Sequence, residues 1–400
     1  MNANLDRSIN RTIRRYYAFS FLENLHFFSA VLVPFFTDWG HITQAEIQLL
    51  QSWFMLWIFL LEIPTGAVAD LWGRKYSLAL GCFVLTIGIV FYGSFSRFEM
   101  FLLAEFLFAC GVALVSGANQ ALLYDALKEA GREEQSSAVF GRAATFELAG
   151  RLVAAPIGSW IAAKYGLNAP LLFSAIPVFV AACVALSIKE PVVYERTSER
   201  IRYLQVVRKG SFFFYRHKTL RILAVDALSV AIAGYFIIWL YQPLLKVVGM
   251  PIAYFGLIHV GLVGSEMLVS SNFARLERLF GSGERLLKCS ALFVAIVFLL
   301  VAWHPNIVTI LVFIMIGGGL GITRLQLMLA YMNKIIPSKQ RATVLSSISM
   351  FRRFALVIVN PVIGYAASYS LNLALLIVGL IPLGVYLFSP VRQNMLEGDE

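Results

Sequence analysis

The chain has 400 residues, of which 59% are apolar and only 14% are charged, and its formal net charge is +10. Soluble globular domains contain fewer apolar and more charged residues, and a single buried core of this length does not need so many apolar residues. The composition therefore excludes an ordinary soluble enzyme or binding module and indicates an integral membrane protein with many membrane spans.

Apolar runs of about twenty residues follow one another along the chain, and each is long enough to cross roughly 30 Å of hydrocarbon. Cut at charged residues and at Gly or Pro breaks, these runs give about twelve helices. The predicted spans are 16–38, 44–69, 75–96, 98–127, 137–164, 168–188, 218–247, 251–276, 284–303, 305–333, 341–368 and 370–389. We therefore predict an all-α membrane protein with twelve transmembrane helices. Cys82, Cys110, Cys183 and Cys289 fall within or beside these helices, which predicts packing residues and neither disulfides nor a metal cluster.

The distribution of Lys and Arg predicts the orientation in the membrane. With twelve spans both termini share one side, and that side receives Arg7, Arg11, Arg14, Arg15, Arg74, Lys75, Lys128, Arg132, the basic run 189–221, Arg275, Arg278, Arg285, Lys288, Lys334, Lys339 and Arg341. The opposite loops hold little more than Arg97, Lys164 and Lys246. By the positive-inside rule both termini are cytoplasmic. The net charge is then a topology signal with some attraction to anionic lipid, and it does not indicate nucleic-acid binding.

The two halves of the chain resemble each other. The segments "PIGSWIAAKYGLNAPLLFSAIP" (156–177) and "PVIGYAASYSLNLALLIVGLIP" (361–382) have the same length and lie 205 residues apart. Similar offsets relate Glu62 to Glu266 and Glu23 to Asp226. We therefore predict two pseudo-symmetric six-helix bundles, 1–190 and 218–400 with a short cytoplasmic tail, joined by a polar cytoplasmic linker at 191–217. Parallel halves of this kind place a substrate site near the bilayer midplane at their interface.

The stretch between the second and third predicted helices, "GAVADLWGRK" (66–75), has an unusual concentration of charge and glycine. It closely resembles the signature loop of the major facilitator superfamily, written roughly G-x-x-x-D-x-x-G-R-K. Gly66 and Gly73 are expected to let the backbone turn tightly. Arg74 and Lys75 are expected to stay at the anionic lipid surface. The resemblance implies that Asp70 engages the other half near the start of the eleventh helix, beside Arg341. The stretch is then a gating latch; a plain cytoplasmic turn is the alternative.

Two other motifs of that superfamily are weak. Where many proton-coupled members carry an arginine in the fourth helix, this chain has "LLAEFLFACG" with Glu105. In the fifth helix the exporter pattern G-x-x-x-G-P-x-x-G-G is replaced by "GRLVAAPIGS", which keeps small residues and a proline. Both departures weaken the case for proton antiport.

Several ionisable residues are predicted to lie deep in the membrane. Each costs about 2.5–3.5 kcal/mol at the bilayer centre on insertion scales, so such residues normally face a cavity or a partner. Glu23 and His26 share one face of the first helix, and Asp226 lies at a similar depth in the seventh. The resemblance implies that these two helices line the central cavity, so the three residues are candidates for proton coupling. Buried carboxylates that only pack are the alternative.

Further deep charges are candidates for bridges between the bundles or for the cavity wall. Glu147 and Arg151 lie one turn apart on the fifth helix and predict a local ion pair as readily as a substrate contact. Neighbouring helices in the superfamily imply bridges from Glu266 to Arg142 or Arg151, and from Glu62 to Arg352 or Arg353. Arg324 on the tenth helix is the remaining deep cation, for which a cavity position and a packing position remain open.

No pattern of an intramembrane enzyme is present: the five His form no H-x-x-x-H pair, and G-x-S-x-G and Walker sequences are absent. We therefore predict no enzyme and no cofactor, but a secondary transporter, a monomer in the plasma (inner) membrane. Proton-coupled efflux of small amphipathic compounds is the function that the resemblance favours. Transport of an anionic metabolite by the deep arginines is the alternative, and a membrane receptor without transport is the third reading.

Overall fold

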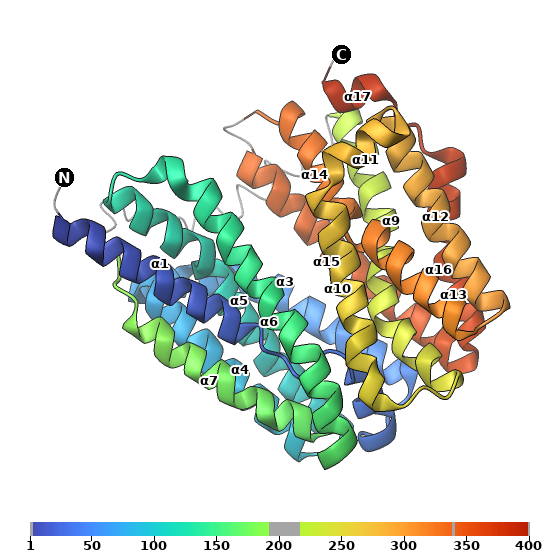
Figure 1. The fold of residues 1–400 in the computed structure, drawn as a ribbon, viewed down its shortest axis with the longest axis horizontal. Coiled ribbons are helices and arrows are strands. Elements are labelled where there is room, and N and C mark those ends of the chain that lie inside the picture. Colours follow the sequence, from blue (N-terminus) through green and yellow to red (C-terminus); the bar gives the residue numbers. More distant parts are fainter. Residues whose placement is uncertain (1–2, 192–216, 338–340, 399–400) are drawn as a thin grey trace. The chain divides into compact units, whose positions relative to one another are not determined.

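The computed structural model describes residues 3–191, 217–337 and 341–398, and the regular structure in these ranges is helical throughout (Figure 1). The chain folds into two compact units. Unit 1 contains residues up to Ile42, Leu50–Ile201 and Ile252–Gly256, and unit 2 contains Thr43–Leu49, Arg202–Pro251 and Leu257 onward. The predicted linker 191–217 lies, apart from its two end residues, outside the described residues.

The helices of the first half are α1 (Ala3–Glu23), α2 (Leu32–Pro34), the π-helix η1 (Phe35–Trp39), α3 (Gln44–Trp72), α4 (Arg74–Ser94), α5 (Phe98–Glu129), η2 (Glu133–Gln135), α6 (Ser136–Tyr165) and α7 (Ala169–Ser187). Those of the second half are α9 (Lys218–Val247), η3 (Ile252–Tyr254), α10 (Phe255–Ser271), α11 (Phe273–Phe280), α12 (Gly283–Trp303), α13 (Ile307–Val312), the π-helix η4 (Phe313–Ile322), α14 (Arg324–Ile335), α15 (Arg341–Tyr369), α16 (Leu371–Phe388) and α17 (Gln393–Glu397).

Nine helical segments of the described chain are long and apolar enough to cross a membrane, and a tenth is α3 if its two parts, bent by 48° at residue 63, form one span. The chain is thus a multi-pass integral membrane protein. The two remaining predicted spans, α1 with its continuation and α6, carry more charge. The all-helical fold is confirmed, and a total of twelve spans is consistent with these helices.

Three predicted helices differ from the structure. The first predicted span, 16–38, is two pieces, since α1 ends at Glu23 and helix resumes only at Leu32. The predicted span 251–276 breaks at Asn272, whose side-chain Nδ2 donates to Leu268 O at 2.9 Å and so competes with the next helical turn. The predicted span 305–333 is interrupted by the ten-residue π-helix η4. Apolar periodicity predicts where a span lies but does not register such local interruptions.

Close helix contacts in each unit depend on glycine. In unit 1, α4 lies beside α5 and α7 (Figure 1). A Cβ at Gly81 of α4 would lie 2.9 Å from the carbonyl oxygen of Gly111 on α5. In unit 2, a Cβ at Gly234 of α9 would lie 2.3 Å from the carbonyl carbon of Gly321 in η4. These pairs bring backbones together as small residues do in membrane helix packing.

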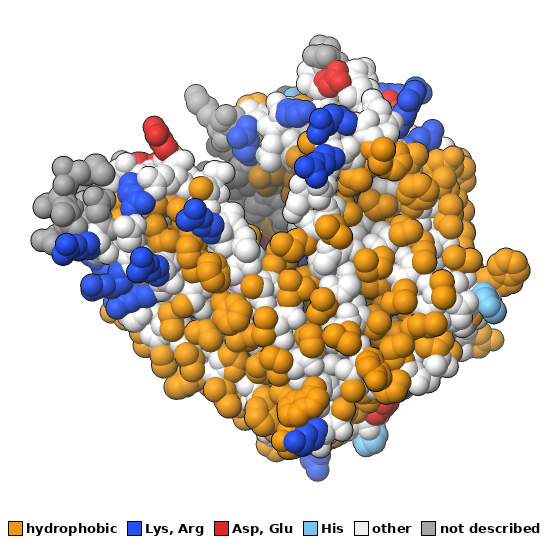
Figure 2. Space-filling model, in the orientation of Figure 1, with side chains coloured by type: hydrophobic (Ala, Val, Ile, Leu, Met, Phe, Trp, Pro, Cys, Tyr) orange, Lys and Arg blue, Asp and Glu red, His pale blue; other side chains and the backbone are white. Residues whose placement is uncertain are grey.

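Exposed side chains are sorted by type in both units (Figure 2). Hydrophobic side chains cover the lateral helix faces, and Lys and Arg gather near the N-terminal end of α1 and around α11. Exposed apolar residues include Trp160, Phe173, Trp303 and Phe388. This is the surface expected of helices that face lipid. All four cysteines are free thiols, and Cys183 is exposed on α7 although the sequence predicted packing.

Candidate functional site

The first helix ends in the interior of unit 1, at Glu23. The next residue, Asn24, is buried, and its Nδ2 donates to Ser20 O at 3.0 Å and to Glu23 Oε2 at 2.6 Å. A side chain that bonds the backbone of its own helix offers an alternative to the next helical turn. Asn24 thus ends α1, and its neutral side-chain amide is the hydrogen-bond donor to the carboxylate of Glu23.

Two glycines of α6 accommodate the non-helical segment 24–31. A Cβ at Gly158 would lie 1.6 Å from Phe27 O, and one at Gly150 would lie 2.6 Å from Phe21 O. The backbone N–H of Phe27 donates to Ser174 Oγ of α7 at 2.9 Å. Side chains and small residues from two neighbouring helices therefore support the break, as non-helical backbone at membrane depth requires.

Charged and aromatic groups surround this break. Arg151 of α6 donates from Nε to Asn24 Oδ1 at 3.1 Å, and Glu147 and Arg151 both act electrostatically on Glu23. The predicted ion pair between Glu147 and Arg151 does not form between these two described residues, because Arg151 bonds the amide of Asn24. His26 stacks on Phe28 with ring centroids 5.1 Å apart. Among the described residues, no hydrogen-bond partner reaches the buried Nε2 of His26.

Glu105 lies elsewhere in unit 1. Its side chain is buried on α5 and accepts a hydrogen bond from Gln51 Nε2 at 2.9 Å. One turn before it, the carbonyl oxygen of Leu102 accepts from Trp53 Nε1 at 3.0 Å. Glu105 is thus a buried carboxylate with a neutral amide partner, in a different hydrogen-bond network from the partly buried Glu23.

Unit 2 contains a buried ion pair that the sequence analysis did not predict. Arg324 of α14 donates from Nη2 to Asp226 Oδ1 of α9, and the two side chains are 1% and 3% exposed. Arg324 Nη1 also donates to Leu287 O at 2.6 Å and to Ser290 Oγ at 2.7 Å, both on α12. Ser389, just beyond α16, donates from Oγ to Asp226 Oδ2 at 2.7 Å. The pair therefore links α9, α12, α14 and the residue after α16.

The π-helix η4 directly precedes Arg324. Its sequence "FIMIGGGLGI" contains four glycines, and Gly318 and Gly319 face Leu262 and Ser265 of α10. A π-helix is rare and usually short, and it is frequently found at functional positions. Here the glycines let the wider turn lie against α9 and α10, and the helix returns to α-geometry at Arg324.

A further set of buried polar atoms lies on α9 and α15. Among the described residues, no hydrogen-bond partner reaches Trp239 Nε1, Arg352 Nε or the Oδ1 and Nδ2 of Asn360, and the side chain of Asn360 is fully buried. Buried polar groups normally have partners, so exceptions call for an explanation such as a bound ligand. Arg352 is the one predicted deep arginine in this set.

The predicted gating motif is not a loop. Gly66 and Asp70 lie in α3, Gly73 alone separates the helices, and Arg74 and Lys75 begin α4. Gly73 has φ +104°, which favours glycine, whereas a Cβ at Gly66 would meet nothing within 4 Å. The expectation of a tight turn therefore holds for Gly73 and is wrong for Gly66, since no residue from Gly66 to Trp72 interrupts the helix. Asp70 is exposed on the last turn of α3.

Acidic residues of unit 1 hold the start of α4. Arg74 Nη1 forms an ion pair with Asp125 of α5 and donates to Ala121 O. The carboxylate of Glu190 accepts from the backbone N–H groups of Arg74 at 2.6 Å and Lys75 at 2.9 Å. A carboxylate at a helix N-terminus satisfies unpaired N–H groups and complements the helix dipole. The side chain of Arg74 therefore contacts α5 of unit 1, although we expected it at the lipid surface.

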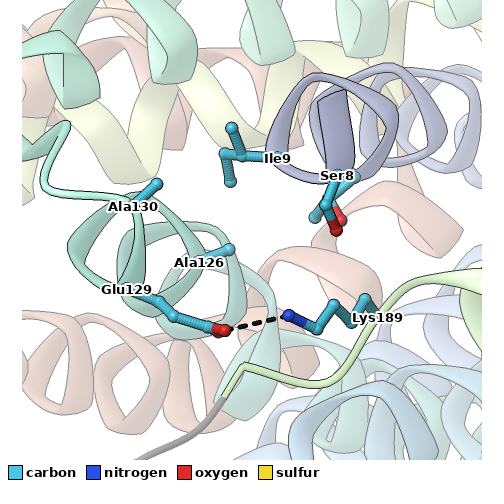
Figure 3. Close-up of a pocket in the computed structure, with 7 residues that line it drawn as sticks. Ser8, Ile9, Ala126, Glu129, Ala130 and Lys189 are labelled. Atoms are coloured by element: carbon cyan, nitrogen blue, oxygen red, sulfur yellow. Dashed lines mark hydrogen bonds and ion pairs between the residues drawn. The ribbon is translucent and has the colours of Figure 1, made fainter. Parts of the chain in front are cut away.

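A small cavity nearby joins α1, α5 and Lys189, in the segment after α7 (Figure 3). It is lined by Ser8, Ile9, Ala126 and Ala130, and Lys189 Nζ pairs with Glu129 Oε1 at 2.9 Å across its edge (Figure 3). Its volume of about 10 Å³ is too small for a substrate. We regard it as a packing defect beside a surface ion pair.

The predicted bridging residues Glu62, Glu266 and Arg353 are partly buried on α3, α10 and α15. Their predicted bridges join the two units and stay predictions. Among the described residues, no three His, Cys, Asp or Glu side chains group as metal ligands.

Sequence reasoning missed Asn24, Asp125, Glu190 and Ser389. Asn24 was the easiest of these to predict from the sequence. An Asn side chain can hydrogen-bond to nearby backbone groups and so competes with helix formation, and this Asn is next to a deep Glu. Asp125 lies near the end of α5 and Glu190 shortly after α7, so nothing in their local pattern distinguishes them from surface charges.

The family model described as the Major Facilitator Superfamily matches residues 17–360. An uncharacterized MFS-type transporter of Methanocaldococcus jannaschii is 24% identical over 194 residues, which is 48% of this chain and 48% of the relative. The matched region thus spans about half the length of that curated relative.

Solved structures match nearly the whole chain. A crystal structure of the nucleoside transporter NupG has a TM-score of 0.79 at 16% identity, and covers 94% of this chain and 97% of that one. A bacterial homolog to the human lysosomal transporter Spinster, in an inward-facing and unoccupied conformation, has a TM-score of 0.73 at 15% identity over 99% and 97% of the chains. At these identities the likeness shows the fold alone.

Proposed function

Because the chain belongs to the major facilitator superfamily, we propose that it is a secondary active transporter that works by alternating access and exports small amphipathic compounds in exchange for protons. The observation that carries the coupling proposal is the break after α1. There the carboxylate of Glu23 is bonded by the neutral amide of Asn24. A carboxylate with a neutral partner can gain and lose a proton without separating an ion pair.

Asp226 is the less suitable of the two predicted coupling carboxylates. Its charge is matched by Arg324 and it also accepts from Ser389. Protonation of Asp226 would leave a buried guanidinium without its counter-ion, which is costly. We therefore assign proton exchange to Glu23, with His26 beside the break, and a structural role to Asp226.

The aromatic surroundings of the break support an amphipathic substrate. Phe28 and Phe108 pack edge to face with ring centroids 6.2 Å apart, and both contact the ring of His26. Aromatic faces attract organic cations and apolar rings, and a nearby carboxylate favours positive charge. We propose that the protein is a monomer in the plasma (inner) membrane with both termini in the cytoplasm. It would export its substrate out of the cytoplasm across that membrane.

The test is transport by the purified protein in liposomes with an imposed pH gradient and a lipophilic cationic dye. Wild type should accumulate dye against its gradient, and Glu23→Gln should retain dye exchange at equal pH but lose accumulation. Glu99→Gln, an exposed carboxylate at the start of α5, is the matched control. Unchanged accumulation by Glu23→Gln would refute coupling at this residue.

A second candidate function is transport of an anionic metabolite, which is favoured by the buried Nε of Arg352, for which no described residue is a hydrogen-bond partner. A ligand that binds only the folded state stabilises it, and the stabilisation grows with the logarithm of the ligand concentration above its Kd. If this function is correct, organic anions should stabilise wild type and not Arg352→Gln. Stabilisation by the cationic dye alone would reject it.

A further inference from the structure

The short helix α11 connects two membrane-spanning helices, α10 and α12 (Figure 1). The span before it ends at Ser271 and the span after it begins at Gly283. The eight residues of α11 cover only about 12 Å at the α-helical rise, whereas the hydrocarbon core is roughly 30 Å thick. This helix therefore does not cross the membrane, and it lies at the membrane surface at which the two spans end.

One face of α11 packs on the neighbouring helices. Its residues recur at the i, i+3, i+4, i+7 spacing of an amphipathic helix and are Phe273, Leu276, Glu277 and Phe280. The ring of Phe273 lies 5.5 Å from that of Tyr331 on α14, edge to face. The hydroxyl of Tyr331 donates to Glu277 Oε1 at 2.9 Å. The single acidic side chain of α11 is thus engaged on the inward face.

The opposite face of α11 is basic and exposed. Arg275, Arg278 and Leu279 lie on it, and Leu279 is 79% exposed. A third exposed arginine, Arg285, comes from the first turn of α12, and its Nη1 would lie 3.4 Å from a Cβ at Gly281, the residue after α11. The Lys and Arg side chains around α11 in Figure 2 include this set. The exposed face therefore combines three guanidinium groups with an apolar side chain.

The charges of these three arginines are not matched within the described chain. Arg275 donates from Nη1 to Asn272 Oδ1 at 3.1 Å, and Arg278 donates from Nε to Ala274 O at 3.2 Å, so both acceptors are neutral. The ion pairs of the described residues involve other side chains. Glu284, next to Arg285 in the sequence, accepts from the backbone N–H of Gln393 at 2.9 Å. The outward face thus has a net positive charge.

We propose that α11 is an interfacial helix that binds anionic phospholipid headgroups through Arg275, Arg278 and Arg285, while Leu279 inserts among the adjoining acyl chains. Guanidinium groups recognise phosphate by charge-assisted hydrogen bonds, and clusters of basic residues beside membrane spans are attracted to anionic lipid. Lipid is the occupant because the two flanking spans hold this face at the membrane surface. The proposal is independent of the transported compound and of proton coupling.

The variants remove the charge or test the position of the apolar side chain. Arg275→Gln combined with Arg278→Gln removes two cations and keeps good helix formers. The matched control is Arg97→Gln combined with Lys164→Gln, which removes the same charge from exposed residues of unit 1. Leu279→Trp places a fluorophore at the position that is proposed to insert.

The first experiment titrates the delipidated, detergent-solubilised full chain with phosphatidylglycerol and with phosphatidylcholine, and bound lipids are counted by native mass spectrometry. Wild type should prefer phosphatidylglycerol. Each basic residue near an anionic headgroup changes affinity about fivefold, so the double variant of α11 should bind phosphatidylglycerol about thirtyfold more weakly. Its affinity for phosphatidylcholine should change little. The control variant should bind as wild type does, and inorganic phosphate should not displace the lipid.

The second experiment reconstitutes Leu279→Trp and wild type in phosphatidylglycerol vesicles with brominated acyl chains. The fluorescence that the added Trp contributes above the wild-type signal should be quenched. The proposal is overturned if the double variant keeps its preference for phosphatidylglycerol, or if the control loses it equally. Displacement by inorganic phosphate would assign the arginines to a free anion, and unquenched fluorescence would place this face in water, where an acidic protein binds.

A folding defect is recognised by the melting temperature without added lipid, which should match wild type because the substituted side chains point outward. If the double variant melts early, the single variant Arg285→Gln decides. It leaves α11 unchanged and should bind phosphatidylglycerol about fivefold more weakly. Unchanged binding by that folded variant would then overturn the proposal.

Discussion

Replacement of Asp226 by Asn tests whether this residue has a structural role in its ion pair or a role in proton coupling. The substitution keeps the size of the side chain and an oxygen that can accept from Ser389. It removes the charge that matches Arg324 and turns an N–H donor toward a guanidinium that also only donates. Both residues are nearly inaccessible, so water cannot replace the lost partner.

The size of the effect follows from the partners that remain. Removing one member of a buried ion pair costs about 3–5 kcal/mol. Arg324 keeps its bonds to Leu287 O and Ser290 Oγ, which offset part of the loss, so we expect the lower end, about 3 kcal/mol. Glu23→Gln is the matched control: the partner of Glu23 is a neutral amide, so the change should cost about 1 kcal/mol or less.

The free energy of unfolding is measured by denaturant titration in detergent micelles for both single variants and for Asp226→Leu combined with Arg324→Met. The double variant removes both charges and should recover most of the loss, because replacing a buried pair by apolar residues is often close to neutral. The reasoning fails if Asp226→Asn costs no more than Glu23→Gln, or if the double variant is less stable than Asp226→Asn.

Three further predictions test other parts of the molecule. Gly158→Ala should destabilise the protein and abolish transport, because its Cβ would lie 1.6 Å from Phe27 O, whereas Gly141→Ala on the same helix should behave as wild type in melting and transport assays. Asp70→Asn should strongly reduce transport and leave the melting temperature unchanged, since Asp70 is exposed at the end of α3; normal transport would remove the latch. Reversing Glu62 to Arg should reduce transport, and Arg353→Glu in the same chain should restore part of it; no rescue with either Arg352 or Arg353 would end the bridge hypothesis.

The positions of most helices were predictable from the sequence, because hydrocarbon thickness sets the length of every apolar run. The predicted span 98–127 is α5, Phe98–Glu129, and the predicted span 218–247 is α9 with the same bounds. The sequence did not predict the irregular backbone conformation within a span. The residues around the break at Asn24 and within the π-helix η4 are mostly apolar. Hydropathy therefore cannot distinguish these segments from continuous α-helix.

The candidate site was less predictable, because burial identifies a charged residue as important without naming its partner. The sequence selected Asp226 and Arg324 as separate deep charges, yet the structure pairs them across 98 residues of chain. Arg151 and Glu147 are one turn apart and should have paired by spacing alone. Asn24, brought beside Arg151 by the end of α1, receives that hydrogen bond instead. Partner choice is thus a property of tertiary packing and not of spacing on one helix.

The two halves use their equivalent carboxylates differently. Glu23 and Asp226 correspond in the predicted internal repeat, and each lies in the first long helix of its predicted half. Around Glu23 the helix stops and the partner is an amide, so protonation changes one hydrogen bond. Around Asp226 the helix continues and the partner is a guanidinium that also bonds α12, so protonation would disturb the contacts among α9, α12 and α14. A coupled transporter needs only one site that titrates during its cycle, and the second half gains from a fixed anchor. Under the proposed proton coupling, this asymmetry assigns proton exchange to the first half and leaves the ion pair of the second half as a fixed anchor.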